Sequence, residues 1–320
     1  MSYRLIFTAV LAVTGTPGVV VAADQVRPVR LLVPFAPGGG ADTLARIITP
    51  KLSEAMGAQW VVDNRGGAAG NIAAETVARA TPDGNTVFMG FSTVLTVNPS
   101  LYKLTFDPVK DLKPVTLLAT AQYILVVNPG VQAANVKELV ALLKQKPRSL
   151  NFSSAGVGSP LHLAGELFRK RAGVEMTHIP YKGGGPAAAA VLGGEAHVIF
   201  GSVAASLPHI KAGKLRALAT TGLRRSRVAP ELPTMAEQGF PGFDVTTWYA
   251  FMVPAATPAN LVSRLREEAI RAVQRPDVQQ VMAGQGLEAE TSTPQELAAR
   301  IAAETKTWGE VIRTAGIKAE

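Results

Sequence analysis

Two glycine-rich segments have the residue types and spacing of an anion-binding site. The first runs from Ala36 to Asp42 (A-P-G-G-G-A-D), and the second from Ser153 to His162 (S-S-A-G-V-G-S-P-L-H). Each follows a short apolar run and precedes a helical pattern, which predicts a loop that opens a helix. The first N–H groups of a helix lack partners and carry the positive end of its dipole. The pair therefore predicts a site for a carboxylate, phosphate or sulfate.

Nucleotides are not the expected anion. Neither loop ends in the Lys-Ser/Thr of a P-loop, and neither has the G-x-G-x-x-G pattern. Each loop by itself also fits an ordinary strand-to-helix turn that binds nothing. In the anion-binding interpretation, Ser153, Ser154 and Ser159 add neutral hydroxyl donors, and Asp42 is placed to cap the first helix.

The histidines do not favour catalysis or metal binding. His162 with a loop serine and a distant aspartate would resemble a hydrolytic triad, but the chain has no G-x-S-x-G elbow. A helix N-terminus lowers an imidazole pKa, so we expect His162 to be a neutral hydrogen-bonding or capping residue. With no cysteine in the chain either, we expect no enzyme, no metal site and no cofactor. The other histidines fall in separate predicted elements without metal-ligand spacing: His178, His197 and His209.

Some polar and aromatic residues leave two interpretations open. Trp248 and Tyr249 either stack on an aromatic ligand or fill a hinge. Arg65 and Lys182, in glycine-rich turns, either contact the anion or are solvated. The basic stretch at 223–227 has no interleaved aromatic residue, so nucleic-acid binding is not expected.

The elements that must position these loops occur twice. Strands are predicted at 29–35, 59–62 and 86–91, with helices after the glycine loop and at 71–80. The second half repeats this order from residue 151 to 202. Gly38 to Gly66 is 66 − 38 = 28 residues and Gly156 to Gly183 is 183 − 156 = 27. Two similar βαβαβ lobes, each with a mostly parallel sheet, are the simplest account.

Long extended segments link the two lobes. Residues 114–129 predict a crossing strand, and 215–221 followed by 245–254 predict the return, which together make a hinge. We expect an α/β fold of two lobes that can close over a ligand between them. The predicted division is a signal peptide at 1–23, lobe 1 at 24–122 with about 222–277 returning to it, lobe 2 at 123–221, and C-terminal helices at 278–320 that pack on the lobes.

The N-terminus predicts export. Met1 to Arg4 supplies one positive charge, an apolar run follows, and V-A-A at 21–23 suits signal peptidase, although a buried N-terminal strand is the alternative. Removing 1–23 leaves a chain with 31 − 24 = +7 charges, without a lipobox cysteine and without membrane insertion. The periplasm is the predicted location. The 47% hydrophobic residues over 320 residues provide enough apolar surface for two cores.

Longer motifs resemble one known family. P-F-A-P-G-G-G-A-D at 34–42, V-D-N-R-G-G-A-A-G-N at 62–71 and S-S-A-G-V-G-S-P-L-H-L at 153–163 are similar to the Bug-type receptors of tripartite tricarboxylate transporters. Further matching stretches lie at 179–183, 210–219 and 232–237, so the resemblance runs from about residue 27 to the C-terminus.

The resemblance implies an α/β, two-lobed periplasmic binding protein (Venus flytrap). Such a monomeric receptor captures a small carboxylate between its lobes and hands it to membrane transporter subunits by transient contact. A receptor that serves a signalling partner has the same pocket and remains an alternative, as does, more remotely, a secreted hydrolase. The ligand-binding residues carried over by position are Phe35, Ala36, Gly38, Gly39, Asp42, Ser92, Thr93, Ser153, Ser154, Gly156, Gly158, Ser159, His162, Tyr181, Ser202 and Trp248.

Two departures from the family pattern bear on the ligand. Gly184-Gly185 stand before Pro186 where the family often has Ser-Ala, and Gly201 follows Phe200 where it often has Asp. A pocket without that carboxylate is expected to be more open and less acidic. It would suit an organic acid without an ammonium group, either aromatic or dicarboxylic.

Overall fold

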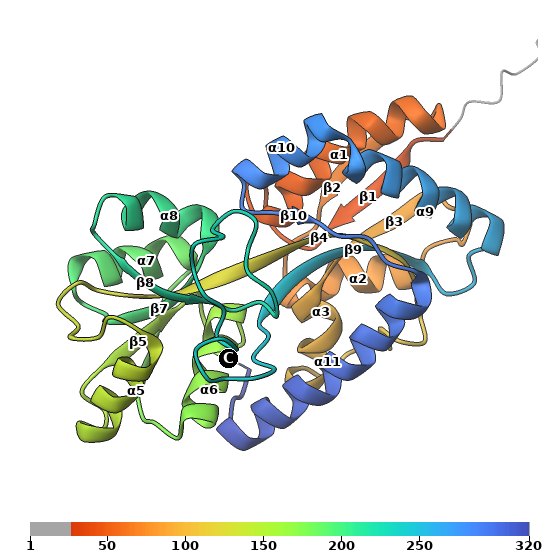
Figure 1. Ribbon diagram of the computed structural model, residues 1–320. Coiled ribbons are helices and arrows are strands. Elements are labelled where there is room, and N and C mark those ends of the chain that lie inside the picture. Colours follow the sequence, from red (N-terminus) through yellow and green to blue (C-terminus); the bar gives the residue numbers. More distant parts are fainter. Residues whose placement is uncertain (1–26, 320) are drawn as a thin grey trace, which may run out of the picture.

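The computed structural model describes residues 27–319 (Figure 1). The predicted signal peptide, residues 1–23, lies outside the described residues. Within 27–319, no helix is both long and apolar enough to cross a membrane.

The first lobe contains the first predicted βαβαβ unit. Its three strands pair in parallel in the order β2-β1-β3, and each is followed by a helix. The helices after β1 and β2 are as predicted, whereas the helix after β3 was not predicted. Small and polar residues follow each apolar strand. These residue types favour turns, and the helices begin after them. The elements are β1 (Val29–Val33), α1 (Gly40–Met56), β2 (Trp60–Asn64), η1 (Ala68–Gly70), α2 (Asn71–Ala78), β3 (Thr86–Phe91), α3 (Ser92–Thr96) and α4 (Asn98–Leu101).

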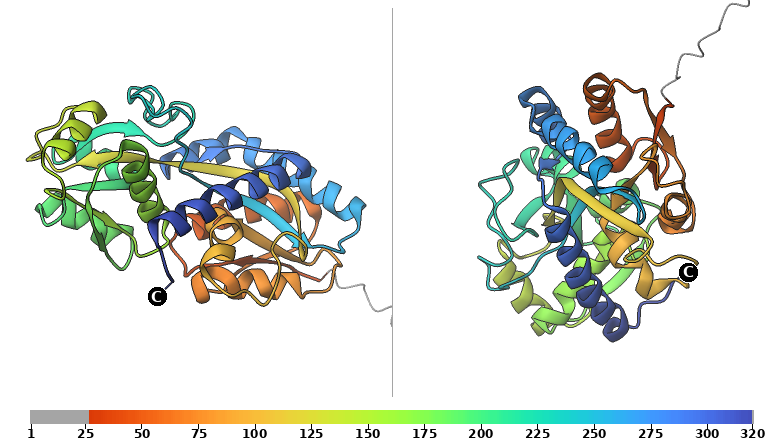
Figure 2. Two further views of the ribbon diagram at one scale, coloured as in Figure 1. Left: turned by 90° about the horizontal axis from the view of Figure 1, so that it is seen from below. Right: turned by 90° about the vertical axis from the view of Figure 1, so that its right-hand side faces the viewer.

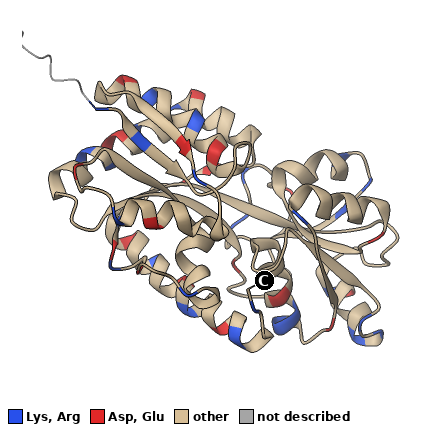
Figure 3. Ribbon diagram, turned by 180° about the vertical axis from the view of Figure 1, so that it is seen from behind, with Lys and Arg blue, Asp and Glu red and all other residues tan. Residues whose placement is uncertain are grey.

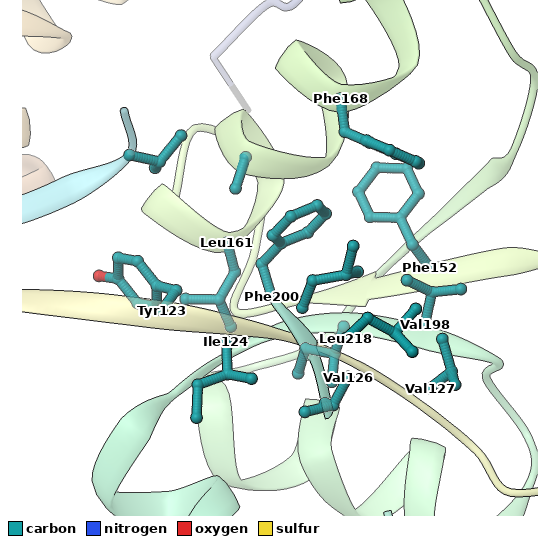
Figure 4. Close-up of a cluster of buried hydrophobic side chains, with 14 of the residues drawn as sticks. Tyr123, Ile124, Val126, Val127, Phe152, Leu161, Phe168, Val198, Phe200 and Leu218 are labelled. Atoms are coloured by element: carbon teal, nitrogen blue, oxygen red, sulfur yellow. The ribbon is translucent and has the colours of Figure 1, made fainter. Parts of the chain in front are cut away.

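The second lobe repeats this plan. Its strands pair in parallel in the order β7-β5-β6, and a further helix, α5, precedes them. A single core of apolar side chains fills the space between this sheet and its helices (Figure 4). The elements are α5 (Val136–Gln145), β5 (Asn151–Ser154), α6 (Pro160–Ala172), β6 (Thr177–Pro180), α7 (Gly184–Gly193), β7 (Val198–Ser202), α8 (Val203–Lys211) and β8 (Arg216–Thr220).

Two crossing strands join the lobes. β4 (Leu112–Val127) is 16 residues long and passes through both lobes, and β9 (Thr246–Pro254) pairs with its first part (Figure 1). Residues 112–122 of β4 pair with β9, whereas 123–127 pair with β7. β4 and β9 are antiparallel to each other and to their outer neighbours β7 and β3. The expectation of a mostly parallel sheet therefore holds for the outer strands and is wrong at the centre, because the chain crosses and returns there.

The C-terminal elements pack mainly on the first lobe. α1, α9 and α10 cover one face of its sheet, and α2, α3 and α11 cover the other (Figure 2). At the start of α11, Thr293 and Glu296 form a capping box, with bonds of 2.8 and 3.1 Å. The elements are α9 (Ala259–Gln274), α10 (Pro276–Gly284), β10 (Glu288–Ala289) and α11 (Pro294–Ala315).

Candidate functional site

The strand directions bring the predicted loops to face each other. β3 is antiparallel to β9 and β9 is antiparallel to β4, so β3 runs with β4 toward the second lobe. β7 is antiparallel to β4 and so runs back toward the first lobe. The carboxyl ends of the two parallel groups, where α1, α3, α6 and α8 begin, therefore point into the same space. Ligands of open α/β sheets bind outside the carboxyl ends of the strands.

The register gives the scale of this space. Phe91 at the end of β3 pairs with Tyr249, which pairs with Ala119 of β4. Ser202 at the end of β7 pairs with Tyr123. Four residues of β4 separate the two strand ends, which is about 13 Å at about 3.3 Å per residue. A small organic molecule fits between them.

A cavity of about 200 Å³ lies between the first residues of α1 and those of α8. None of its lining residues carries a formal charge, so the donors it offers are backbone amides, hydroxyls and amide side chains. The N–H groups that begin a helix have no acceptor inside the helix. The cavity is lined by Gly38, Gly40, Thr43, Ala121, Gln122, Tyr123, Ser202, Val203, Ala204, Tyr249, Gln285, Gly286 and Leu287.

Two buried tyrosines among the lining residues keep uncharged, protonated hydroxyls at physiological pH. Burial raises the pKa of Tyr123 to about 12, even though its hydroxyl shares a hydrogen bond with Thr247. Burial also raises the pKa of Tyr249, and the nearby Tyr123 adds to the shift. Charged residues are distributed over both lobes, with Lys and Arg interspersed among Asp and Glu (Figure 3).

Asp42 holds the first loop in place. Gly38 has a φ of +93°, and its N–H donates to the Asp42 carboxylate at 2.9 Å. Arg46 also donates to this carboxylate, at 3.0 Å. Burial alone would raise the pKa of Asp42, but the bonds from Arg46 and Gly38 outweigh it and lower the pKa. The carboxylate is 4% exposed and fully engaged, so it positions the loop.

Asp42→Asn should destabilise the protein at neutral pH. Because the folded state lowers the pKa of Asp42, the ionised carboxylate stabilises the fold above the unfolded pKa, which is about 4. That contribution is lost as the pH falls through the lower, folded value. The difference in unfolding free energy between wild type and variant should therefore shrink from pH 7 to pH 3 in urea titrations. The exposed Asp83→Asn is the control, and a difference for Asp42→Asn that stays constant with pH would contradict the assignment.

Side chains of the second loop are bonded within their own lobe. Ser159 caps α6: its hydroxyl accepts from the His162 N–H at 3.3 Å and donates to the Gly156 carbonyl at 2.7 Å. The Gly158 N–H donates to His162 Nδ1 at 3.1 Å. Ser154 shares a 2.7 Å hydrogen bond with His178 Nε2. These contacts shape the loop while its backbone remains partly exposed.

Three aromatic rings, those of His162, His178 and Phe152, form a stack beside this loop. His162 stacks on His178 with ring centroids 3.9 Å apart, and His178 stacks on Phe152 at 4.9 Å. Burial lowers the pKa of His162 to about 3, and the neighbouring His178 adds to the shift. Burial lowers the pKa of His178 to about 4, with Arg169 adding to the shift. His162 is thus neutral, as predicted, with burial as the main cause.

These histidines should make stability rise with pH between about 4 and 6.5. Their folded pKa values are lowered, so in this range the unfolded chain binds protons that the folded chain excludes. Each contributes up to about 1.4 kcal/mol per pH unit. His178→Phe keeps a ring in the stack and should reduce the slope of unfolding free energy against pH in denaturant titrations from pH 4.5 to 7.5. His209→Phe, at the half-buried end of α8, is the control, and an unchanged slope in His178→Phe would count against the stack.

The predicted site residues separate into three groups. Gly38 and Ser202 line the 200 Å³ cavity, and Ser92 and Thr93 line a much smaller one beside α6. Ser153 and Trp248 are fully buried: Ser153 donates to the Ala187 carbonyl, and the Trp248 indole donates to Glu304 of α11. The rest lie at the end of β5, in the loops after β1, β5 and β6 or at the helix starts that follow, and they line neither cavity: Phe35, Ala36, Gly39, Asp42, Ser154, Gly156, Gly158, Ser159, His162 and Tyr181.

Sequence reasoning missed several cavity residues. Tyr123 is in the segment predicted only as a crossing strand. Tyr249 was not missed, because it was predicted either to stack on a ligand or to fill the hinge. Residues 285–287 come from the α10–β10 turn, where Gly286 lies against Ala204 of the second lobe. An aromatic residue with a polar group in the middle of a predicted crossing strand is a sequence signal that could have identified Tyr123 as a cavity residue. No local signal marks residues 285–287.

Comparison with known proteins agrees with this geometry. Residues 44–317 match the model of the "Tripartite tricarboxylate transporter family receptor". The chain belongs to this receptor family. The receptor is 36% identical to the protein BugT of Bordetella pertussis, over 97% of this chain and 98% of BugT.

Solved structures extend the comparison. The periplasmic binding protein BugD has a TM-score of 0.75 and 32% identity, covering 92% of the receptor and 99% of BugD. The R. palustris protein Rpa4515 with adipate has a TM-score of 0.79 and 35% identity, over 92% and 99%. MatC from Rhodopseudomonas palustris with bound malate has a TM-score of 0.75 and 31% identity, over 90% and 99%. The receptor therefore has the two-lobed periplasmic binding protein fold and is a solute-binding receptor rather than an enzyme, so these predictions are confirmed.

Proposed function

We propose that this receptor captures a small carboxylate in the interlobe cavity and delivers it to the membrane subunits of a tripartite tricarboxylate transporter. The observation that carries the proposal is a cavity between the starts of α1 and α8 whose lining residues carry no formal charge and include two protonated tyrosines. Helix starts bind anions without a cationic side chain. Related structures that contain adipate and malate support a carboxylate as the ligand.

The mechanism follows from the crossing strands. β4 and β9 join the lobes near Gln122 and Tyr123, where β4 changes partner from β9 to β7. Bending there would bring the loops after β1 and β3 onto those after β5 and β7 and close the acid between them. We assign residues 24–122, with the return at about 222–277, to lobe 1 and 123–221 to lobe 2. The signal at 1–23, the periplasmic location, the monomeric state and the transient transporter contact belong to the same proposal.

Two departures from the family pattern, Gly184-Gly185 and Gly201, limit the class of ligand that we propose. A Cβ at Gly201 would lie 2.5 Å from the Ser206 hydroxyl oxygen, so an aspartate there requires Ser206 to move. A Cβ at Gly184 or Gly185 would meet nothing within 4 Å. The pocket lacks the family carboxylate that would pair with an ammonium group. We therefore propose a dicarboxylate or aromatic acid rather than an amino acid.

Calorimetric titration of the mature chain tests the proposal. Malate, adipate and benzoate are compared with aspartate and with dimethyl adipate, which keeps the length of adipate and loses both charges. We expect at least one plain acid to bind and dimethyl adipate not to bind, because helix N–H groups favour the anion. Tight aspartate binding without any plain acid would overturn the ligand class. Equal binding of adipate and its ester would overturn anion capture.

A further inference from the structure

One of the two tyrosines that line the interlobe cavity has an unpaired hydroxyl. Tyr123 shares a hydrogen bond with Thr247, whereas the Tyr249 hydroxyl has no hydrogen-bond partner within residues 27–319. Tyr249 is 5% exposed, so water does not freely solvate this group. A buried polar group without a partner costs stability. A bound molecule that accepts a hydrogen bond from Tyr249 would remove that cost.

The Tyr249 hydroxyl opens onto the cavity rather than into the core. Its oxygen lies beside the first residue of α1, since a Cβ at Gly40 would be 2.3 Å from it, and both residues line the cavity. Within residues 27–319, the side-chain polar atoms that are fully enclosed without a partner belong to Trp60, Arg169 and Thr257. The Tyr249 hydroxyl is not one of these atoms. It therefore keeps accessible surface, and the space beside it is the cavity.

The start of α1 offers further hydrogen-bond donors at the same place. Its N-cap residue is Gly39, which has no side chain to cap the helix, and the N–H groups of residues 40–42 have no acceptor inside the helix. By contrast, α8 begins on the other side of the cavity and is capped by the Ser202 side chain. The uncapped start of α1 and the Tyr249 hydroxyl together lack an acceptor. A carboxylate has enough lone pairs to bond to both.

Packing holds the Tyr249 hydroxyl in position. The Tyr249 ring packs edge-on against Phe91 at 5.5 Å, and Phe91 packs edge-on against Phe35 at 4.9 Å. Burial raises the pKa of Tyr249, so the hydroxyl keeps its proton at physiological pH. A donor that is already fixed loses little conformational entropy when a ligand binds.

We propose that the Tyr249 hydroxyl donates a hydrogen bond to a carboxylate oxygen of the ligand, beside the free N–H groups at the start of α1. This assignment rests on the proposed function, and it places the carboxylate at α1 rather than at α8. Tyr123 has a structural role instead, because its hydroxyl is already bonded to Thr247.

Two measurements on Tyr249→Phe test the assignment. The first is calorimetric titration with malate, adipate and benzoate. For the acid that binds the wild type most tightly, we expect the affinity to fall about ten- to hundredfold, the effect of one hydrogen bond to a charged group. The second is thermal unfolding without ligand, in which the melting temperature should stay the same or rise, because the hydroxyl has no partner to lose. A merely structural tyrosine would lower the melting temperature and leave the affinity intact.

Two matched variants serve as controls. Tyr123→Phe removes a bonded hydroxyl and should lower the melting temperature. Tyr102→Phe, at the end of α4 and outside the cavity, should change neither the affinity nor the melting temperature. The assignment is overturned if Tyr249→Phe binds the acid as tightly as the wild type, or if its ligand-free form melts well below the wild type. If none of the acids binds the wild type, the proposed function itself fails, and the assignment fails with it.

Discussion

Gly40→Ala is expected to lower the affinity for the carboxylate at least tenfold. A Cβ at this position would lie 2.3 Å from the Tyr249 hydroxyl oxygen, far inside van der Waals contact. Tyr249 is 5% exposed and packs edge-on against Phe91 at 5.5 Å, so its ring cannot move away freely. Either the start of α1 or the tyrosine must shift, and both line the interlobe cavity. Calorimetric titration with the best acid measures the loss.

A compensating variant tests whether this clash is the cause. In the Tyr249→Phe/Gly40→Ala double variant, the atom at 2.3 Å is gone and the next ring atom lies 3.3 Å from the new Cβ. We expect the double variant to bind no more weakly than Tyr249→Phe alone, because the clash no longer exists. If the loss of binding free energy in the double variant equals the sum of the losses in the two single variants, the clash with Tyr249 is not the cause. Full affinity in Gly40→Ala would contradict the location of the site.

Phe152→Ala is expected to cost about 3–5 kcal/mol of unfolding free energy. Phe152 is fully buried in the core of the second lobe (Figure 4). Its ring stacks on His178, and helix α6 approaches so closely that a Cβ at Gly165 would lie 2.2 Å from it. The missing ring leaves a cavity that neither helix nor sheet can close. Denaturant titration at pH 7 measures the loss.

The effect should also reach the glycine-rich loop after β5. Phe152 precedes Ser153 and Ser154 and supports the His178 ring to which Ser154 is bonded. We therefore expect weaker carboxylate binding even where the variant is fully folded. Phe240→Ala, at a half-buried position on the edge of the same core, is the control and should cost less. A cost below about 1 kcal/mol for Phe152→Ala would show that the stack is not a structural support.

The sequence was informative wherever structure is set by local pattern. Strands were predicted from apolar runs, helix starts from glycine, proline and capping residues, and the repeat of βαβαβ units from the spacing of glycines, and all are present in the structure. The helix Val136–Gln145 was not predicted, although its N-terminus carries a capping pair. The Asn135 side chain accepts from the Glu138 N–H and donates to the Glu138 carboxylate. Its apolar residues lie within a long connection after β4 that gave no other sign of a helix.

Side-chain roles in the site depended on contacts between distant segments. The sequence could place Trp248 on a return strand, but period-2 alternation alone does not say which face is toward the ligand. In the structure Trp248 is on the α11 side, while its neighbour Tyr249 is on the α1 side and lines the cavity. Likewise, Ser153 and Asp42 are typical anion-loop residues, yet both are occupied by bonds inside their own lobes.

The sequence by itself therefore determined the α/β lobes, the crossing strands, the family and the two loops that open helices, because each follows from local spacing of apolar, glycine and capping residues. Only the tertiary structure decided that the sheet is antiparallel at its centre, that the strand ends face each other across β4, and that residues 285–287 complete the cavity. These features arise from pairing between segments far apart in the sequence, such as Glu288 of β10 with Thr120 of β4, which no local pattern encodes.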